Sequence, residues 1–349
     1  MSATAPITHS DIWFEDGNVV LQAERTQFRV YRGMLARNSS VFRDMFSIPQ
    51  PAPSEESADG CAVVCLPDAA QDVEIVLRAL TEPGFVIPGD RSYLTARGSM
   101  PIERVAALLR LGQKYDFEAL RTEALHRIFY EVPTTLEDFD SHAKCSQIYT
   151  EVDGTLWPNL LKLARDHNLQ SALPLALYRC SGGIDIDSED SSYPFGESGY
   201  LISVEDQILC LSCFSRLMRL HKLLTKKWLQ SIPKPFSACV DTGSCNHAHE
   251  FHLRNAVCLE SGLAGLDDGY MYAWRSSMLM SYRVCQPCNE VIKAMHNAVR
   301  QDFWAQLPEI FGLPGWDELR KERAESVRTA FCSPYRQRAE YIFFQLKPK

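Results

Sequence analysis

The fold is decided by two neighbouring stretches, Ser10-Asp-Ile-Trp-Phe-Glu-Asp-Gly-Asn-Val-Val-Leu-Gln-Ala23 and Phe28-Arg-Val-Tyr-Arg-Gly-Met-Leu-Ala-Arg-Asn-Ser-Ser-Val-Phe-Arg-Asp-Met-Phe46. In the first stretch, apolar and polar residues alternate around Asp16-Gly17, and Asp-Gly between alternating strands predicts a hairpin. A third strand follows at Thr26–Tyr31, with Phe28 and Val30 turned inward. Neither stretch contains a residue that is expected to act as a catalyst, so this pattern favours an interaction module over an enzyme.

Short helices and a further strand are expected next. The spacing of apolar residues predicts helices over Gly33–Arg37 and Val41–Phe46, with Asn38 or Ser39 as the N-cap of the second. Cys61–Leu66 is typical of a buried strand. Asp68, with Gln71 three residues later, forms a capping-box pattern for a helix through Leu80. Further helices are expected from Ile102 to about Tyr115 and after Asp116.

The second half of the chain is predicted to be mostly helical. Helices are expected at Leu156–His167 and Ser171–Tyr178, and residues 181–199 have the small, acidic composition of a flexible linker. A long helix, Val204–Trp228, follows, and another covers about Asn289–Gln306. The predicted buried stripe of the long helix consists of Ile208, Leu211, Leu217, Leu220 and Leu224.

Length and composition limit the class of protein. A chain of 349 residues allows about two domains. The net charge of −8 argues against a general basic surface for nucleic acid, although it leaves room for a local basic patch. No apolar run reaches the ~20 residues that span a bilayer, and Met1–His9 lacks the pattern of a secretory signal. We therefore expect an intracellular protein of the cytoplasm or nucleus, whose 12 cysteines are thiols or metal ligands.

The order of elements resembles the BTB/POZ domain. The residues that carry the resemblance are Phe28, Val30, Leu35, Ser40, Phe42, Met45 and Phe46, followed by the segment Leu109-Arg-Leu-Gly-Gln-Lys-Tyr-Asp-Phe-Glu-Ala-Leu120. The chain as a whole looks like a fungal BTB-domain protein of the large mushroom-type families. Tyr31 stands where many relatives have His, and only ten residues precede Asp11, too few for the additional strand and helix that many animal relatives swap between subunits.

The resemblance implies a fold and a kind of partner. The expected class is α+β, with a BTB/POZ-like domain over residues 10–130, a helical extension over 131–180, the acidic linker 181–199 and a helical C-terminal domain over 200–349. The partners would be proteins, either a second copy in a homodimer or a cullin-type scaffold of a ubiquitin ligase.

Cysteines supply the strongest chemical signal. Cys239 and Cys245 lie in a polar segment, and Cys285-Gln-Pro-Cys288 directly precedes a helix, all within or beside the Cys/His-rich segment 233–290. Four thiolates from two loops can enclose a zinc ion tetrahedrally, and such a closed site is structural. The alternative is four ordinary thiols, because the five-residue gap between the first pair is wider than usual.

Other residues compete for the role of ligand. His247, His249 and His252 follow Cys245 and are either replacement ligands or solvated loop residues. Cys258 and Cys332 are expected to be small buried residues, and Cys210 and Cys213, despite their C-x-x-C spacing, lie in an apolar helical stripe and are expected in the core.

Enzyme motifs are missing from the sequence. His249-Glu-Phe-His252 has the wrong gap for the metalloprotease pair, and no P-loop, dinucleotide fingerprint or G-x-S-x-G elbow is present. We therefore predict a non-enzymatic protein–protein interaction module, an adaptor or scaffold, with a structural zinc. The alternative is a zinc-dependent transcriptional or DNA-binding regulator that contacts nucleic acid through residues 233–290.

Overall fold

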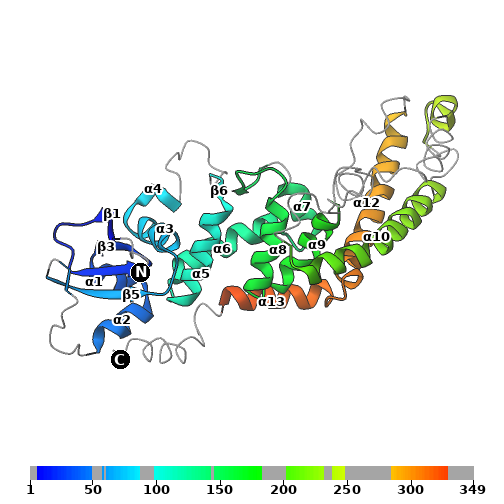
Figure 1. Cartoon of the computed structure of the whole chain (residues 1–349). Coiled ribbons are helices and arrows are strands. Elements are labelled where there is room, and N and C mark those ends of the chain that lie inside the picture. Colours follow the sequence, from blue (N-terminus) through cyan, green and yellow to red (C-terminus); the bar gives the residue numbers. More distant parts are fainter. Residues whose placement is uncertain are drawn as a thin grey trace. The chain divides into compact units, whose positions relative to one another are not determined.

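The structure is a computed structural model that describes residues 6–48, 57–58, 60–86, 98–142, 145–182, 202–231, 238–247 and 284–328 (Figure 1). These residues form two compact units, and each is described by itself. Unit 1 comprises the described residues within Met1–Glu131, Cys145–Glu151 and Ala324–Lys349, and unit 2 those within Val132–Lys144 and Val152–Arg323.

Unit 1 is built on a mixed sheet. Its strands are β1 (Thr8–Trp13), β2 (Val19–Ala23), β3 (Thr26–Val30), β5 (Cys61–Leu66) and the two-residue β4 (Ser57–Ala58), in the order β1-β3-β2-β5-β4. Strands β2 and β3 are antiparallel, whereas β1 pairs with β3, and β5 with β2, in parallel. Val20, Phe28 and Val30 are 0 % exposed, which places the core of the unit on the central strands.

The hairpin predicted at Asp16-Gly17 is wrong. The two-residue connection at Glu24-Arg25 forms the hairpin, between β2 and β3, and Glu24 has a φ of 51°. The turn at Asp16-Gly17 instead carries the chain past β3, so that β1 lies on the far side of β3. Arg29 of β3 holds this turn by donating its Nε–H to the Gly17 carbonyl at 2.9 Å, a side-chain contact that alternation along the strands does not reveal.

Two short helices follow the sheet, as predicted. They are α1 (Arg32–Asn38) and α2 (Ser40–Ser47), and Ser39 is the N-cap of α2, because its Oγ accepts the Phe42 N–H at 3.0 Å. The same hydroxyl donates to the Tyr115 carbonyl. One serine therefore starts α2 and links it to the end of a distant helix.

Further helices complete unit 1. These are α3 (Ala70–Thr81), the four-residue α4 (Pro83–Val86), α5 (Ile102–Lys114) and α6 (Glu118–Glu131). The predicted cap Asp68 does not cap α3, whose N-cap is Ala69. Asp68 accepts hydrogen bonds from Lys114 Nζ at 2.6 Å and from the Tyr115 hydroxyl at 2.5 Å, so a partly buried cation and a tyrosine outcompete the helix N–H groups for its carboxylate.

The predicted extension 131–180 is not purely helical. It contains α7 (Leu136–His142), α8 (Leu156–Asp166), the 3₁₀ turn η1 (Gln170–Ala172) and α9 (Leu173–Gly182), but also β7 (Ile148–Tyr149). Strand β7 pairs in parallel with β6 (Met100–Pro101) inside unit 1. This pairing is long-range and only two residues long, so periodicity gives no sign of it.

The predicted start of the acidic linker 181–199 is too early. Helix α9 continues to Gly182, and Ser181 is 0 % exposed. Its Oγ donates to the Leu177 carbonyl at 2.8 Å, a bond that lets serine stay inside a buried helix. Residues 183–199 lie outside the described part of the chain.

Three longer helices dominate the rest of unit 2. They are α10 (Val204–Ser231), α12 (Gln286–Ile310) and α13 (Trp316–Arg328), the last of which belongs to unit 2 as far as Arg323. Helices α10 and α12 pack side by side (Figure 1). Trp304 of α12 stacks on Trp316 of α13 with ring centroids 5.2 Å apart, and Trp304 Nε1 donates to the Thr134 carbonyl at 3.2 Å.

The buried stripe of α10 differs from the predicted one. Ile208 and Leu211 are 61 % and 43 % exposed, and Leu220 is half-buried. Leu217 and Leu224 are buried as predicted, and their row is completed by Asp206, Cys210 and Cys213. The spacing of four and three residues along that row makes one narrow seam, and Cys210 and Cys213 lie in the core as predicted.

Candidate metal centre

Four cysteines of unit 2 come together in a compact cluster. The Sγ atoms of Cys239, Cys245, Cys285 and Cys288 all lie within 4.8 Å of one another. Cys288 is 0 % and Cys245 8 % exposed, whereas Cys239 and Cys285 are half-buried. The structure thus brings together the four residues that the sequence singled out as a ligand set, which we call the thiol cluster.

The start of α12 positions two of these thiols. Cys285 is the N-cap residue, Pro287 stands in the first turn, and Cys288 follows it inside that turn. Proline suits this place because the N–H that it lacks has no partner inside the helix. A thiolate at a helix N-terminus also faces the positive end of the helix dipole.

A capped helical turn positions the other pair. Residues 242–247 are helical, and Asp241 caps them: its Oδ1 accepts the Ser244 N–H at 3.0 Å, and its carbonyl accepts the Cys245 N–H at 3.1 Å. The five residues between Cys239 and Cys245 are therefore taken up by a helical turn, which returns the second thiol toward the first. This geometry accounts for the wide gap in the sequence.

Backbone N–H groups reach the sulfur atoms. The Cys285 N–H donates to Cys245 Sγ at 3.3 Å. Hydrogen bonds from the Val240 and Cys288 N–H groups lower the pKa of Cys285 to about 6. Burial, together with the neighbouring thiols, raises the pKa of Cys288 and Cys245. The backbone thus favours one thiolate, while further negative charge in this small volume requires a cation to balance it.

The spacing of the sulfur atoms fits a tetrahedral metal ion. A zinc ion with Zn–S bonds of about 2.3 Å places neighbouring sulfur atoms roughly 3.8 Å apart. Cys285 Sγ and Cys239 Sγ are 3.9 Å apart. A disulfide needs about 2.05 Å, and all four cysteines are free thiols. Four soft donors in a closed set match zinc, and no protein ligand position is left open for a substrate.

Within the described part of the chain, the cluster consists of the four cysteines and includes none of the histidines considered as alternative ligands. His247 is exposed, and His249, His252, Cys258 and Cys332 lie outside the described residues. Cys210 and Cys213 are 0 % and 4 % exposed in the α10 seam, where they were expected. Cys213 Sγ donates to the Ile310 carbonyl at 3.1 Å, a contact typical of a packed thiol.

Sequence reasoning missed Asp241. Its position two residues after Cys239, ahead of Thr-Gly-Ser, is a recognisable N-cap signal.

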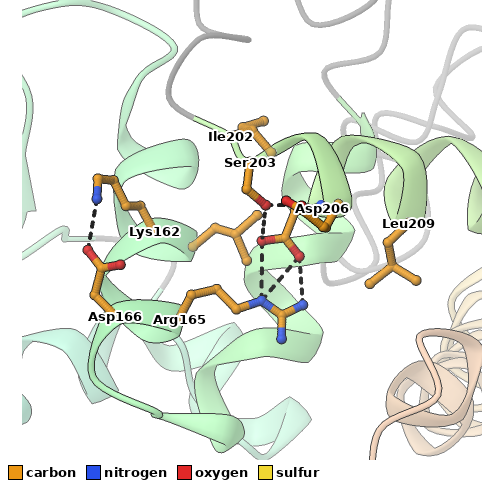
Figure 2. Close-up of a pocket in the computed structure, with 9 residues that line it drawn as sticks. Lys162, Arg165, Asp166, Ile202, Ser203, Asp206 and Leu209 are labelled. Atoms are coloured by element: carbon orange, nitrogen blue, oxygen red, sulfur yellow. Dashed lines mark hydrogen bonds and ion pairs between the residues drawn. The ribbon is translucent and has the colours of Figure 1, made fainter.

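A hollow lies at the start of α10, and it is a second candidate site (Figure 2). Arg165 of α8 points into it and binds Asp206 of α10 through two guanidinium nitrogens: Nη2 and Nε donate to Oδ1 at 2.6 and 3.1 Å. Lys162 pairs with Asp166 at 2.8 Å beside them. The ion pair between Arg165 and Asp206 anchors α10 to α8. Because each cation in the hollow is already paired with a carboxylate, the hollow offers little to an ionic ligand.

Comparison of the chain with protein-family models, with curated proteins and with solved structures finds no match. Among the described residues, no helix combines the length and the apolar character needed to cross a membrane.

Proposed function

We propose that this chain is a non-enzymatic protein-binding module of the BTB/POZ type, an adaptor or scaffold, whose unit 2 is held by a structural zinc ion. The observation that carries the proposal is the arrangement of unit 1. A β2–β3 hairpin, the paired helices α1 and α2, a strand β5 parallel to β2, and the helices α3, α5 and α6 follow one another in the order that the resemblance implies.

Two exposed isoleucines mark surfaces where unit 1 can bind a protein. Ile48 is 46 % exposed and directly follows α2, which is where an adaptor of this type needs an apolar contact for a cullin-type scaffold. Ile7 is 52 % exposed and directly precedes β1, an edge strand of the sheet. The backbone groups at the edge of a sheet favour pairing with another strand, including that of a second copy.

The closed thiol cluster supports a structural role for the metal. Zinc would bind Cys239, Cys245, Cys285 and Cys288, and its binding energy would link the start of α12 to the turn at 242–247. Metal analysis of the purified chain should find one zinc ion per molecule, lost in Cys285→Ser and kept in Cys145→Ser, an exposed cysteine outside the cluster. A folded protein without metal, or equal metal in both variants, would contradict this part of the proposal.

Binding measurements on the full chain test the interaction role. We expect it to self-associate in analytical ultracentrifugation or to bind the purified amino-terminal domain of a cullin-type scaffold in calorimetry. Ile48→Asp should weaken scaffold binding about tenfold and leave self-association unchanged, whereas Ile7→Asp should do the reverse, so each variant is the control of the other. A monomer that binds no scaffold and retards duplex DNA in a gel would overturn the proposal in favour of a DNA-binding regulator.

A further inference from the structure

Helix α10 presents one face to the protein and a second, broad face to solvent. Its buried seam contains Cys210, Cys213, Leu217 and Leu224. At 100° per residue, the exposed side chains from Val204 to Lys227 fall on the opposite arc of the helix. With 28 residues, α10 is about 42 Å long, so this outward face is extended.

The second half of that face is strongly basic. From residue 207 to 231, the helix carries five cations and no carboxylate, and all five cations are exposed: Arg216, Arg219, Lys222, Lys226 and Lys227. Lys227 pairs with Asp302 of α12 at 3.2 Å. Neither Arg219 nor Lys226 has an ion-pair partner within the described part of the chain. In a protein with a net charge of −8, such a concentration of positive charge is a local feature that needs an explanation.

The first half of the same face carries an apolar stripe beside the exposed Glu205 and Ser212. Val204, Ile208 and Leu211, spaced by four and three residues, are 66 %, 61 % and 43 % exposed. Leu223, which is 61 % exposed, stands among the cations of the second half. Single exposed aliphatic residues are common, but three in register along one helical face form a stripe that water solvates poorly.

An acidic protein segment matches this combination of basic and apolar halves better than a nucleic acid or an anionic membrane does. A phosphate backbone would pair with the cations but would leave Val204, Ile208 and Leu211 without an apolar contact. An interfacial membrane helix carries an apolar face along its whole length. Helix α10 instead packs its continuous apolar face against the protein, and its outward face carries an apolar stripe only in the first half and is basic in the second. An amphipathic segment with carboxylates and aliphatic side chains meets both halves.

We propose that the outward face of α10 is a docking surface for an acidic amphipathic protein segment, whose aliphatic residues contact Val204, Ile208 and Leu211 and whose carboxylates pair with Arg219 and Lys226. This inference rests on the proposed function as an interaction module and assigns a second binding surface, in unit 2, to the same chain. The partner is defined by its chemistry: a negatively charged segment that becomes helical on binding.

Calorimetry with the zinc-loaded full chain tests the surface directly. The probe is a synthetic amphipathic helix of leucine and glutamate with the length of α10. The double variant Arg219→Glu/Lys226→Glu should bind it about tenfold more weakly, because two attractions become repulsions, each of modest size at an exposed site. Ile208→Asp should also weaken binding. Lys321→Glu, which reverses an exposed cation on α13, should leave the affinity unchanged.

The outcomes separate this inference from its alternatives. Equal affinity of the probe for wild type and double variant, or no binding at all, would overturn it. Tighter binding of duplex DNA, or of phosphatidylserine vesicles, than of the probe would overturn it in favour of those ligands. Because scaffold binding and self-association are measured on unit 1 variants, the α10 surface can fail while those activities persist, and the reverse also holds.

Discussion

The two units of this chain differ in how evenly their apolar cores are filled. Unit 1 has a continuous apolar core in which Val20, Phe28 and Val30 of the sheet are fully buried, together with Val105 and Leu108 of α5. In unit 2 the core becomes sparse toward the start of α12, where only Cys288, Ile292 and His296 are buried before Val299. The thiol cluster lies at that end. The proposed metal ion would therefore stand where apolar burial is least able to hold two segments together.

This difference predicts how each unit responds to damage. A core of packed side chains loses stability in steps, as single residues are truncated. A four-ligand metal centre is cooperative, because its binding energy is part of the folding energy of the segments that it joins. Unit 1 should therefore weaken gradually, while the metal-bound end of unit 2 should be lost at once.

The largest expected effect is that of removing the metal. Structural zinc contributes about 10–16 kcal/mol of apparent binding free energy in small domains, so Cys288→Ser or chelation should unfold the turn at 242–247 and the first turns of α12. Hydrogen exchange followed by mass spectrometry should show lost protection there and unchanged protection in β2 and β3. Cys61→Ser, a change at a buried cysteine in unit 1, should leave the exchange of α12 as it is. Unaltered exchange at α12 in the metal-free protein would mean that the two units do not differ in this way.

A smaller effect is expected from a change in the apolar core of unit 1, Phe28→Ala in β3. Truncation of a fully buried phenylalanine costs about 3–5 kcal/mol, through lost burial and the cavity left behind. Denaturant titration should show a lower midpoint for the transition of unit 1, while the metal content stays at one ion per chain. If the variant also loses its metal, the stabilities of the two units are coupled, and the units do not respond separately to damage.

Local patterns predicted much of the fold, and long-range pairing accounts for what they missed. Alternation located β2 and β3, and Ser39 was recognisable as the cap of α2. The same alternation suggested a hairpin at Asp16-Gly17, although the identity of the neighbouring strand depends on contacts distant in sequence. Asp68 likewise looks like a cap until Lys114 and Tyr115 approach from another helix.

The candidate site was more predictable than its surroundings. Cysteine spacing alone indicated all four members of the thiol cluster. The type of a ligand and its position next to a helix start can both be recognised from neighbouring residues in the sequence. The outward face of α10 was missed, since Ile208 and Leu211 were assigned to the core. Which of two aliphatic rows on a long helix is buried depends on the neighbouring helix, and the sequence of α10 does not contain that information.

A pH-dependent effect of intermediate size is expected within unit 2. Burial lowers the pKa of His221 on α10 to about 4, below the value of about 6.5 in an unfolded chain. The folded state thus favours the neutral imidazole, and the stability associated with it is present above pH 6.5 and lost as the pH falls toward 4, by about 1 kcal/mol per pH unit at most. Wild type and His221→Gln should therefore converge in unfolding free energy on acidification. Protonation of the thiol cluster affects both proteins alike, so parallel curves would refute this role of His221.

The smallest effect tests whether the metal centre depends on the turn that presents Cys245. Asp241→Ala removes the oxygen that accepts the Ser244 N–H, and the loss of such an N-cap costs about 0.5–2 kcal/mol. All four sulfur ligands remain, so zinc should still bind, with an affinity about tenfold lower in competition with a chelator. Asp241→Asn keeps an acceptor oxygen and should recover most of that loss.

Cobalt substitution distinguishes a positioning role of Asp241 from a direct one. If the carboxylate only caps the turn, the absorption spectrum of the cobalt form should keep the shape of a four-thiolate site in both variants, because the ligands themselves do not change. A changed spectrum in Asp241→Ala would mean that the carboxylate contacts the metal. An unchanged zinc affinity would mean that the four thiolates impose the turn on residues 242–247, and the metal would then organise its own ligands at this end of unit 2.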